Sequence, residues 1–210
     1  MILTKICGLS TPATIDAALK GGATHVGLVF FPPSPRNLSH DAAAGLAARV
    51  PVHVGKVGVF VDPDDETLER AIVAAALDAV QLHATTSTRV ADIRARFGRE
   101  TWAAIAIKTR ADLDAARAYA GAADRILYDA KTPPGAALPG GMGVRFDWTL
   151  LEGFRHPAPW GLSGGLDATN VAEAIARTGA PLVDVSSGVE SAPGVKEVDK
   201  IAAFLRAAGI

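Results

Sequence analysis

The sequence predicts a single-domain α/β protein, a (β/α)8 or TIM barrel that spans residues 1–210. Short β-rich runs alternate with amphipathic runs about eight times along the chain, which indicates parallel strands joined by crossover helices. Eight such repeats in 210 residues take about 26 residues each and leave little of the chain for anything else. No G-x-G-x-x-G follows the first β-rich run, which argues against an open dinucleotide-binding sheet.

The expected elements alternate strictly along the chain. Strands are expected near residues 2–7, 25–30, 54–60, 78–83, 101–107, 125–129, 158–162 and 182–185. Helices are expected near residues 12–20, 40–49, 65–76, 87–97, 111–120, 147–153, 168–178 and 197–208.

Local signals support several of these elements in chain order. Ser10 and Thr11 stand before Pro12, a combination of capping hydroxyls and first-turn proline that begins a helix. The second helix repeats apolar residues at the i, i+3, i+4 spacing of one buried face, and so does the seventh. Acids precede the third and seventh helices, where the helix dipole favours them, and Gly179 marks a helix end.

One connection does not fit the short loops of a barrel. Residues 130–146 contain four Gly and three Pro without periodicity. A segment of this kind in a compact domain is usually functional or disordered. Because it follows the sixth strand, we interpret it as a partly mobile lid over the C-terminal face of the barrel.

Composition excludes several classes of protein. The net charge is −1, with 21 basic and 22 acidic residues, so no basic field is present to hold nucleic acid. The single cysteine excludes an internal disulfide framework, and no apolar run is long enough for a membrane span. The expected location is the cytoplasm. The sequence leaves a monomer and a homodimer equally open.

Two glycine turns near the C-terminus indicate a phosphate site. The seventh strand ends in Ser163-Gly164-Gly165, and the eighth ends in Ser186-Ser187-Gly188. Glycine lets the backbone approach a ligand, and free N–H groups at a helix start attract an anion. In (β/α)8 barrels the loops after strands seven and eight often hold a phosphate. Gly164, Gly165, Ser187 and Gly188 are therefore the phosphate-binding candidates.

Polar residues stand at the ends of four strands, on the side expected to face the barrel interior. They are Cys7, Gln81, His83, Asp129 and Asp184. Catalytic groups of this fold come from the C-terminal ends of strands. A thiolate and a protonated carboxyl would make a base and acid pair, which suggests catalytic roles for Cys7 and Asp129. The alternative for Cys7 is a small buried apolar residue.

Arg36 follows the second strand in a loop stiffened by prolines, FFPPSPRNLS. A guanidinium fixed there can bind a carboxylate through two parallel hydrogen bonds, although an ordinary solvated arginine fits the sequence equally well. No pair or cluster of His and Cys has metal-ligand spacing, so no metal site is expected.

Several motifs together resemble the phosphoribosylanthranilate isomerase family of tryptophan biosynthesis. They are KICG at 5–8, GLVFFPPSPRNL at 27–38, VQLH at 80–83, the lid with FDW at 146–148, LSGGL at 162–166 and DVSSGVESAPGVK at 184–196. The resemblance covers essentially the whole chain. It implies a cofactor-independent Amadori rearrangement of N-(5-phosphoribosyl)anthranilate, a small sugar phosphate, to 1-(2-carboxyphenylamino)-1-deoxyribulose 5-phosphate.

The resemblance also implies roles for the candidates. Asp129 would be the general acid that opens the furanose ring, and Cys7 the general base that removes the proton from C2. Arg36 would hold the anthranilate carboxylate, and Asp184 would contact the anthranilate amine or sugar hydroxyls. Gln81 and His83 would line the mouth.

Three positions depart from the common family pattern. Ala84 replaces a glycine after QLH, Met142 replaces a threonine in the lid, and Glu197 replaces an aspartate after PGVK. They bear on loop geometry and lid closure rather than on the chemistry.

Two other functions remain open at this stage. One is the related isomerase of histidine biosynthesis, or a bifunctional enzyme, but such enzymes typically use two strand-end aspartates where this chain has Cys7 and Asp129. The other is a non-catalytic sugar-phosphate sensor that would need neither residue. Turnover of phosphoribosylanthranilate would distinguish the isomerase of tryptophan biosynthesis from the histidine-pathway isomerase and from the sensor.

Overall fold

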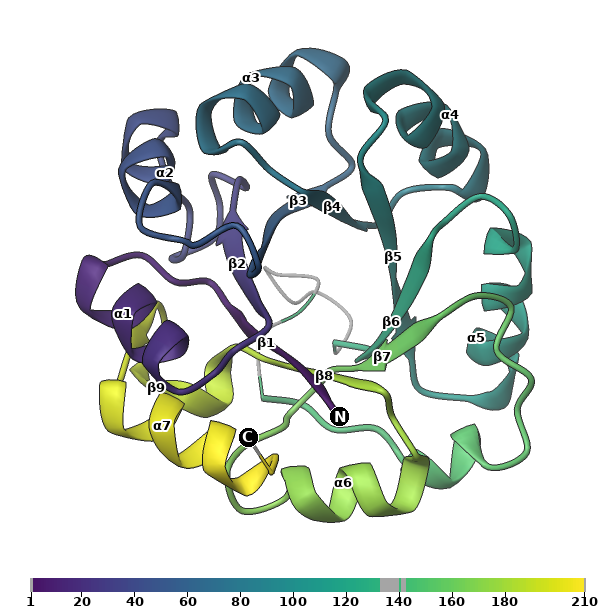
Figure 1. The fold of residues 1–210 in the computed structure, drawn as a ribbon. Coiled ribbons are helices and arrows are strands. Elements are labelled where there is room, and N and C mark those ends of the chain that lie inside the picture. The colour runs from purple at the N-terminus through teal and green to yellow at the C-terminus, as the bar shows by residue number, and fades with distance from the viewer. Residues whose placement is uncertain (1, 133–139, 141–142, 210) are drawn as a thin grey trace.

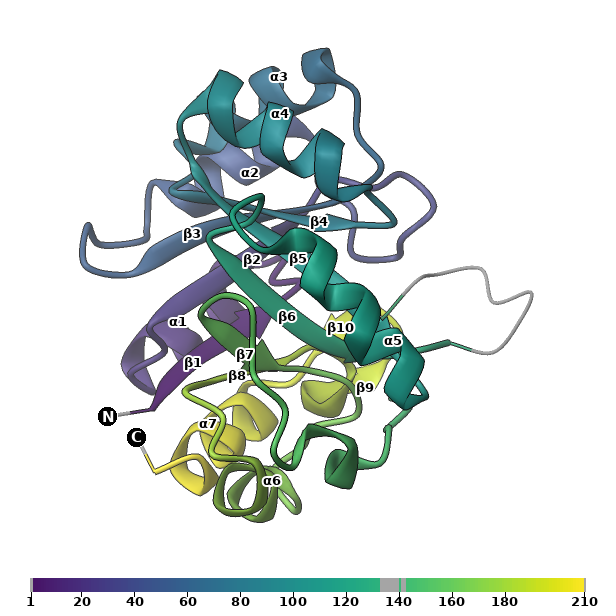
Figure 2. The same ribbon diagram turned by 90° about the vertical axis from the view of Figure 1, so that its right-hand side faces the viewer.

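Eight parallel strands close into a barrel in the order β1 to β8, and helices surround it (Figure 1). The structure is a computed structural model, and the residues it describes are 2–132, 140 and 143–209. Figure 2 gives the view from the side. The predicted fold class is confirmed, and none of the helices within the described ranges is long and apolar enough to cross a membrane.

The barrel strands are β1 (Leu3–Cys7), β2 (His25–Val29), β3 (Gly55–Val61), β4 (Ala79–His83), β5 (Glu100–Ile107), β6 (Arg125–Ala130), β7 (Trp160–Leu162) and β8 (Leu182–Val185). The α-helices are α1 (Pro12–Lys20), α2 (His40–Ala47), α3 (Asp65–Ala75), α4 (Ser87–Phe97), α5 (Arg110–Ala115), α6 (Val171–Thr178) and α7 (Val198–Ala207). Short 3-10 helices are η1 (Ala116–Tyr119), η2 (Trp148–Leu151) and η3 (Ser187–Val189), and β9 (Glu190–Ala192) pairs with β10 (Val195–Lys196).

The capping signals position the helices as expected. Thr11 caps α1 with its side chain, and Pro12 is the first helical residue. Asp64 caps α3 by accepting a hydrogen bond from the backbone N–H of Thr67 at 2.8 Å. Gly179 ends α6 in the left-handed conformation at φ 66°. These local hydrogen bonds explain why the helix boundaries are legible in the sequence.

Three expected helices differ from the observed ones. The helix expected at 147–153 is only the 3-10 turn η2, and the one expected at 111–120 divides into α5 and η1. The helix expected at 168–178 begins at Val171, because the carboxylate of Asp167 accepts the N–H of Thr169 at 2.8 Å and holds a turn there. Such side-chain bonds to the backbone compete with helix formation. The β9–β10 hairpin was not expected.

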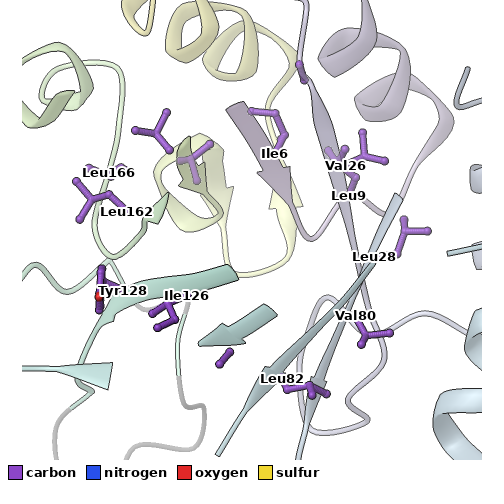
Figure 3. Close-up of a cluster of buried hydrophobic side chains, with 14 of the residues drawn as sticks. Ile6, Leu9, Val26, Leu28, Val80, Leu82, Ile126, Tyr128, Leu162 and Leu166 are labelled. Carbon is purple, nitrogen blue, oxygen red and sulfur yellow. The ribbon is translucent and has the colours of Figure 1, made fainter. Parts of the chain in front are cut away.

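Alternate residues of each strand pack against opposite faces. The outward set, which includes Ile6, Leu28, Leu82 and Tyr128, packs beneath the helices in a large buried cluster (Figure 3). The inward set closes the bottom of the barrel with a smaller cluster: Val57, Ala79, Trp102, Leu127 and Leu182. At the other end of the barrel, the inward strand-end candidates line a pocket at the C-terminal mouth.

The three departures from the family pattern have different outcomes. Ala84 has φ 52°, in the left-handed region that favours glycine, so its backbone follows the conformation that a glycine would adopt more readily. Glu197 is the N-cap residue of α7 without a side-chain capping bond. Met142 lies outside the described residues, as does much of the expected lid, residues 133–139 and 141–142.

Candidate active site

A pocket at the carboxyl ends of the strands gathers nearly all of the candidate residues. Its empty space, including the open mouth, is about 820 Å³. Nine of the residues expected at the site line it: Cys7, Arg36, Gln81, His83, Asp129, Gly164, Gly165, Asp184 and Ser187. The tenth, Gly188, packs against the carbonyl oxygen of Leu166 behind the pocket wall.

A buried ion pair lies beside Cys7. Lys5 Nζ donates to Asp184 Oδ1 at 3.0 Å, with both side chains almost fully buried. The two residues are register partners across β1 and β8. Lys5 and Cys7 are two residues apart on β1, so their side chains share the inward face. The arrangement places a positive charge next to the only thiol of the chain.

The environment of Cys7 acts on its pKa in two directions. Burial raises the pKa of the thiol, and Asp184 adds to this, whereas Lys5 and Lys196 lower it. The net direction is upward, because burial and Asp184 outweigh the two lysines. Gly27 faces Cys7 across β1 and β2, and a Cβ at Gly27 would lie 2.9 Å from Cys7 Sγ. Glycine at this position therefore makes room for the thiol.

Asp129 occupies a site that favours its protonated form. Burial and the charge of Asp184 together raise the pKa of this carboxyl to about 7. The backbone N–H of Ala130 donates to Asp129 Oδ1 at 2.8 Å, which fixes the orientation of the carboxyl. A carboxylic acid with a pKa near neutrality retains a proton that it can donate to a substrate.

The two glycine turns lie against each other. A Cβ at Gly188 would overlap the carbonyl oxygen of Leu166, so the loop after β8 contacts the loop after β7 backbone to backbone. Gly164 and Gly165 have φ of 87° and 63°, a conformation that L side chains rarely adopt. No partner for the N–H of Gly164 or of Gly165 lies within the part of the chain that the structure describes. These groups are available to an anion.

The end of the expected lid packs on the first of these turns. Arg145 Nε donates to the carbonyl oxygen of Gly165 at 3.0 Å, and Arg145 Nη2 contacts Asp167 Oδ2 at 3.0 Å. A Cβ at Gly165 would overlap the side chain of Arg145 and lie 2.8 Å from the carbonyl oxygen of Val144. Residues 143–145 are thus anchored beside the phosphate candidates.

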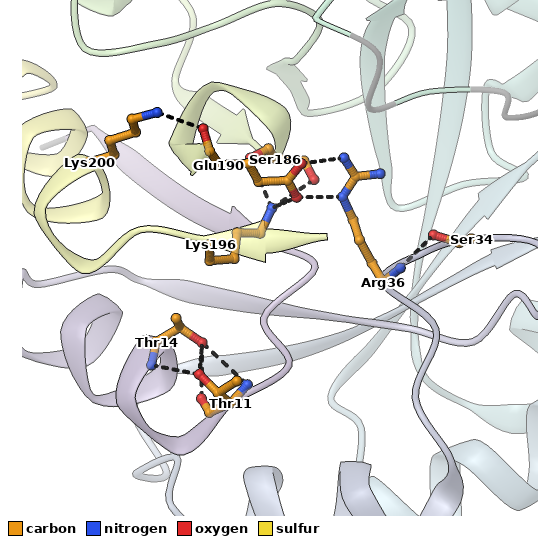
Figure 4. A network of polar contacts seen from close by, with 8 residues as sticks. All are labelled: Thr11, Thr14, Ser34, Arg36, Ser186, Glu190, Lys196 and Lys200. Carbon is orange, nitrogen blue, oxygen red and sulfur yellow. Dashed lines mark hydrogen bonds and ion pairs between the residues drawn. The ribbon is translucent and has the colours of Figure 1, made fainter. Parts of the chain in front are cut away.

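Arg36 belongs to a buried network rather than to a solvated loop (Figure 4). Its Nε and Nη2 donate to Glu190 Oε1 and Oε2, each at 2.7 Å. Lys196 Nζ contacts Glu190 Oε1 at 2.7 Å, the carbonyl oxygen of Ser186 at 2.9 Å and Ser186 Oγ at 3.1 Å. Burial raises the pKa of Glu190, but Arg36 and Lys196 outweigh it and hold this pKa below its ordinary value.

Gln81 and His83 form the far wall of the pocket. Their side-chain nitrogens, Nε2 of each, lie 3.0 Å apart. Burial and the charge of Lys5 lower the pKa of His83 to about 4, so the imidazole is neutral near pH 7. Gln81 Oε1 is buried without a hydrogen-bond partner among the described residues, which leaves it able to accept from a ligand.

Sequence reasoning missed three charged residues of the site: Lys5, Glu190 and Lys196. Lys5 had a usable signal, because a lysine inside an apolar strand shares the inward side with Cys7. Glu190 had no such signal, since its partner Arg36 is 154 residues away in the chain. Lys196 joins the site only through its contacts with Glu190 and Ser186. Within the described residues there is no group of three or more His, Cys, Asp or Glu that could hold a metal ion.

Comparisons with known proteins place the chain in one family. The family model described as N-(5'phosphoribosyl)anthranilate (PRA) isomerase matches residues 4–207. The N-(5'-phosphoribosyl)anthranilate isomerase of Zymomonas mobilis subsp. pomaceae is 56% identical over 208 residues, covering 98% of this chain and 97% of the relative. That of Paramagnetospirillum magneticum is 53% identical over 205 residues, covering 97% of this chain and 95% of the relative.

Solved structures agree with the sequence relatives. The crystal structure of phosphoribosyl anthranilate isomerase from Thermotoga maritima superimposes with a TM-score of 0.89 and 34% identity, covering 100% of this chain and 99% of that one. A second isomerase structure contains reduced 1-(o-carboxyphenylamino)-1-deoxyribulose 5-phosphate. It superimposes with a TM-score of 0.87 and 32% identity, over 100% of this chain and 99% of that chain.

Proposed function

The chain belongs to the N-(5'-phosphoribosyl)anthranilate isomerase family, and we propose which of its pocket residues bind the substrate and catalyse the reaction. The protein catalyses the Amadori rearrangement of N-(5-phosphoribosyl)anthranilate to 1-(2-carboxyphenylamino)-1-deoxyribulose 5-phosphate in tryptophan biosynthesis. The proposal assigns Asp129 as general acid, Cys7 as general base, and the two ends of the pocket to the phosphate and the anthranilate carboxylate.

The phosphate is assigned to the turns after β7 and β8. The N–H groups of Gly164 and Gly165, together with Ser187, are assigned to the phosphate because these residues line the pocket and can donate to an anion. Gly188 contributes by allowing the two turns to approach each other. Two backbone turns in contact form a rigid cradle, which costs little reorganisation when the phosphate binds.

The position of Asp129 carries the assignment of the acid. A Cβ at Gly164 would lie 3.0 Å from Asp129 Oδ1, so the carboxyl stands directly beside the phosphate turn. The furanose ring oxygen is bonded to C4, and C4 is bonded to the carbon that bears the phosphate. A phosphate in the cradle therefore brings the ring oxygen towards Asp129, whose pKa of about 7 keeps a proton available near neutral pH.

As the ring oxygen is protonated, its bond to C1 breaks, and the lone pair of the anthranilate nitrogen forms a C1=N double bond, which gives an open-chain iminium ion. Cys7 then takes the proton from C2, and the C–H electron pair forms the double bond of an enolamine. Tautomerisation of the enolamine, with a proton delivered to C1, gives the ketone. Lys5 stabilises the thiolate form of Cys7 by charge, which opposes the effect of burial on its pKa.

The remaining residues orient the substrate. Arg36 lines the pocket with its guanidinium held by Glu190, and we assign it to the anthranilate carboxylate. Asp184 is assigned to the anthranilate amine through Oδ2, because Lys5 contacts its Oδ1. Gln81, with a buried amide oxygen that has no partner in the described part of the chain, is assigned to a sugar hydroxyl beside His83.

The test is turnover of phosphoribosylanthranilate by the purified protein, followed through the loss of anthranilate-type fluorescence. Asp129→Asn keeps the shape of the carboxyl but removes the transferable proton, so kcat should fall by ~10²- to 10⁴-fold while substrate binding persists. A variant that retains more than about a tenth of the native kcat would remove Asp129 from the role of acid.

A further inference from the structure

We propose that Lys196 is a positioning residue that fixes both ends of the substrate site at once. Through Ser186 it holds the turn assigned to the phosphate, and through Glu190 it holds the guanidinium of Arg36, assigned to the anthranilate carboxylate. The proposal rests on the function proposed above, and it extends that function to a residue outside the pocket wall.

The contacts of Lys196 satisfy the ammonium group completely. An ammonium has three N–H donors, and three acceptors surround this one: Glu190 Oε1 at 2.7 Å, the Ser186 carbonyl at 2.9 Å and Ser186 Oγ at 3.1 Å. The lysine side chain is fully buried, and that of Glu190 nearly so. Because all three N–H donors of this buried ammonium are used, it cannot turn to other acceptors, and Glu190 and Ser186 are held in one geometry.

Each partner of Lys196 leads to a different end of the pocket (Figure 4). Ser186 lines the pocket and directly precedes Ser187, a residue of the phosphate cradle. Glu190 is held at Oε1 by Lys196, while both carboxylate oxygens receive the fork of Arg36. The orientation of the guanidinium therefore depends on a carboxylate whose own position depends on Lys196.

The backbone of the hairpin would survive the loss of the charge. Lys196 and Glu190 are register partners in the antiparallel β9–β10 pair, and the N–H of Glu197 donates to the carbonyl oxygen of Val189 at 2.9 Å. Lys196→Met keeps the length of the side chain and leaves Glu190 paired with Arg36, so no buried charge loses its last partner. This variant tests the positioning role with little disturbance of the fold.

The experiment measures inhibition of the full-length protein by two fragments, inorganic phosphate and anthranilate. Lys196→Met should raise the inhibition constants of both fragments by about tenfold or more, because the loss of a hydrogen bond to a charged group typically weakens binding by about that factor. KM should rise to match, and kcat at neutral pH should fall as well, because the charge of Lys196 lowers the pKa of Cys7. Unchanged constants for both fragments would overturn the proposal.

Two further variants separate the two branches of the network. Glu190→Gln weakens the hold on Arg36 but leaves the contacts of Lys196 with Ser186. It should therefore raise the inhibition constant of anthranilate and leave that of phosphate unchanged. Lys200→Met is the matched control, because Lys200 contacts Glu190 only at its carbonyl oxygen, at 2.7 Å, and should change neither constant. If Glu190→Gln raises both inhibition constants equally, the two branches do not act separately. A Lys196→Met protein that unfolds below the assay temperature would assign Lys196 to stability instead.

Failure of the underlying assignment would look different. Arg36→Met should raise the inhibition constant of anthranilate alone, and Gly165→Glu should raise that of phosphate alone. Both results are expected regardless of the role of Lys196. If either variant leaves its own fragment unaffected, the assignment of that end of the pocket is wrong. If both behave as expected and Lys196→Met changes nothing, only the positioning role fails.

Discussion

Lys5 and Asp184, 179 residues apart in the chain, form a 3.0 Å ion pair inside the barrel beside the only thiol. Both side chains are almost fully buried, so each charge is stabilised mainly by the other. Burial lowers the pKa of Lys5, but Asp184 and Cys7 outweigh it and raise the pKa above its ordinary value. The ammonium is therefore charged throughout the range in which the enzyme is assayed.

Loss of one member of this pair should destabilise the barrel strongly. Lys5→Met leaves the Asp184 carboxylate buried without its cation, which typically costs ~3–5 kcal/mol of unfolding free energy. The double variant Lys5→Met with Asp184→Asn should recover part of that loss, because no unpaired charge remains. Urea unfolding at pH 7 measures both. A single variant that costs less than about 1 kcal/mol would show that water or another group replaces the partner.

In the pH profile of kcat/KM, the catalytic acid should have the lower pKa and the catalytic base the higher one. Asp129 has a pKa of about 7, and that of Cys7 lies above the ordinary thiol range. Below about pH 7 Asp129 stays protonated, and log kcat/KM should rise with the thiolate fraction at a slope near +1. Between the two pKa values the gain of thiolate offsets the loss of the protonated acid, so the profile should be flat. Above the thiol pKa it should fall.

Asp129→Asn should change the shape of this profile as well as its height. Without the carboxyl ionisation, the residual activity should continue to rise through pH 7 up to the thiol pKa, where it becomes flat. Initial rates at fixed ionic strength between about pH 5.5 and 10 measure the profile. A variant profile that levels off near pH 7, as in the native enzyme, would assign that ionisation to another residue.

Cys7→Ser distinguishes a base from a core residue. It keeps nearly the same volume in the space opposite Gly27, but a serine hydroxyl does not ionise near neutral pH. The rate should fall by ~10²- to 10⁴-fold, with unfolding free energy changed by no more than ~1–2 kcal/mol. Thiol alkylation should inactivate the native enzyme, and bound phosphate together with anthranilate should slow it. Near-native turnover in Cys7→Ser would make Asp184 the next base to test.

Gly188→Ala should damage phosphate binding through backbone geometry alone. The added Cβ overlaps the carbonyl oxygen of Leu166 and lies 3.1 Å from the Cα of Asp167, so the two turns must separate. Small displacements of binding groups have large effects, and the phosphate inhibition constant should rise by ~10- to 100-fold. Inhibition by anthranilate serves as the internal control. If inhibition by phosphate is unchanged, the contact between the turns has no part in the cradle.

Gly45→Ala is a matched glycine variant away from the site. Gly45 lies inside α2, and a Cβ there would meet no atom within 4 Å. Replacing glycine in a helix interior by alanine should stabilise the protein by ~0.5–1 kcal/mol, which raises Tm by ~1–4 °C for a chain of this size. Kinetic constants should not change. A lower Tm would indicate that α2 is strained at this position.

The sequence by itself determined the barrel, most element boundaries and the gathering of Cys7, Gln81, His83, Asp129 and Asp184 at one mouth. These features follow from local patterns: periodicity defines each strand and helix, and the parallel strands of a closed barrel end on the same side. The family motifs added the chemistry. The 3-10 turn η2 was misjudged, because its apolar pattern resembles that of an α-helix.

Only the tertiary structure decided how the charges are paired and which way the pKa values move. Arg36 meets Glu190 across 154 residues, and Lys5 meets Asp184 across 179. No local pattern encodes such pairs, because strand register and loop packing bring them together. The pKa of Cys7 is the sum of burial and of opposing charges from Lys5, Asp184 and Lys196, and a sum of that kind exists only once the chain has closed around them.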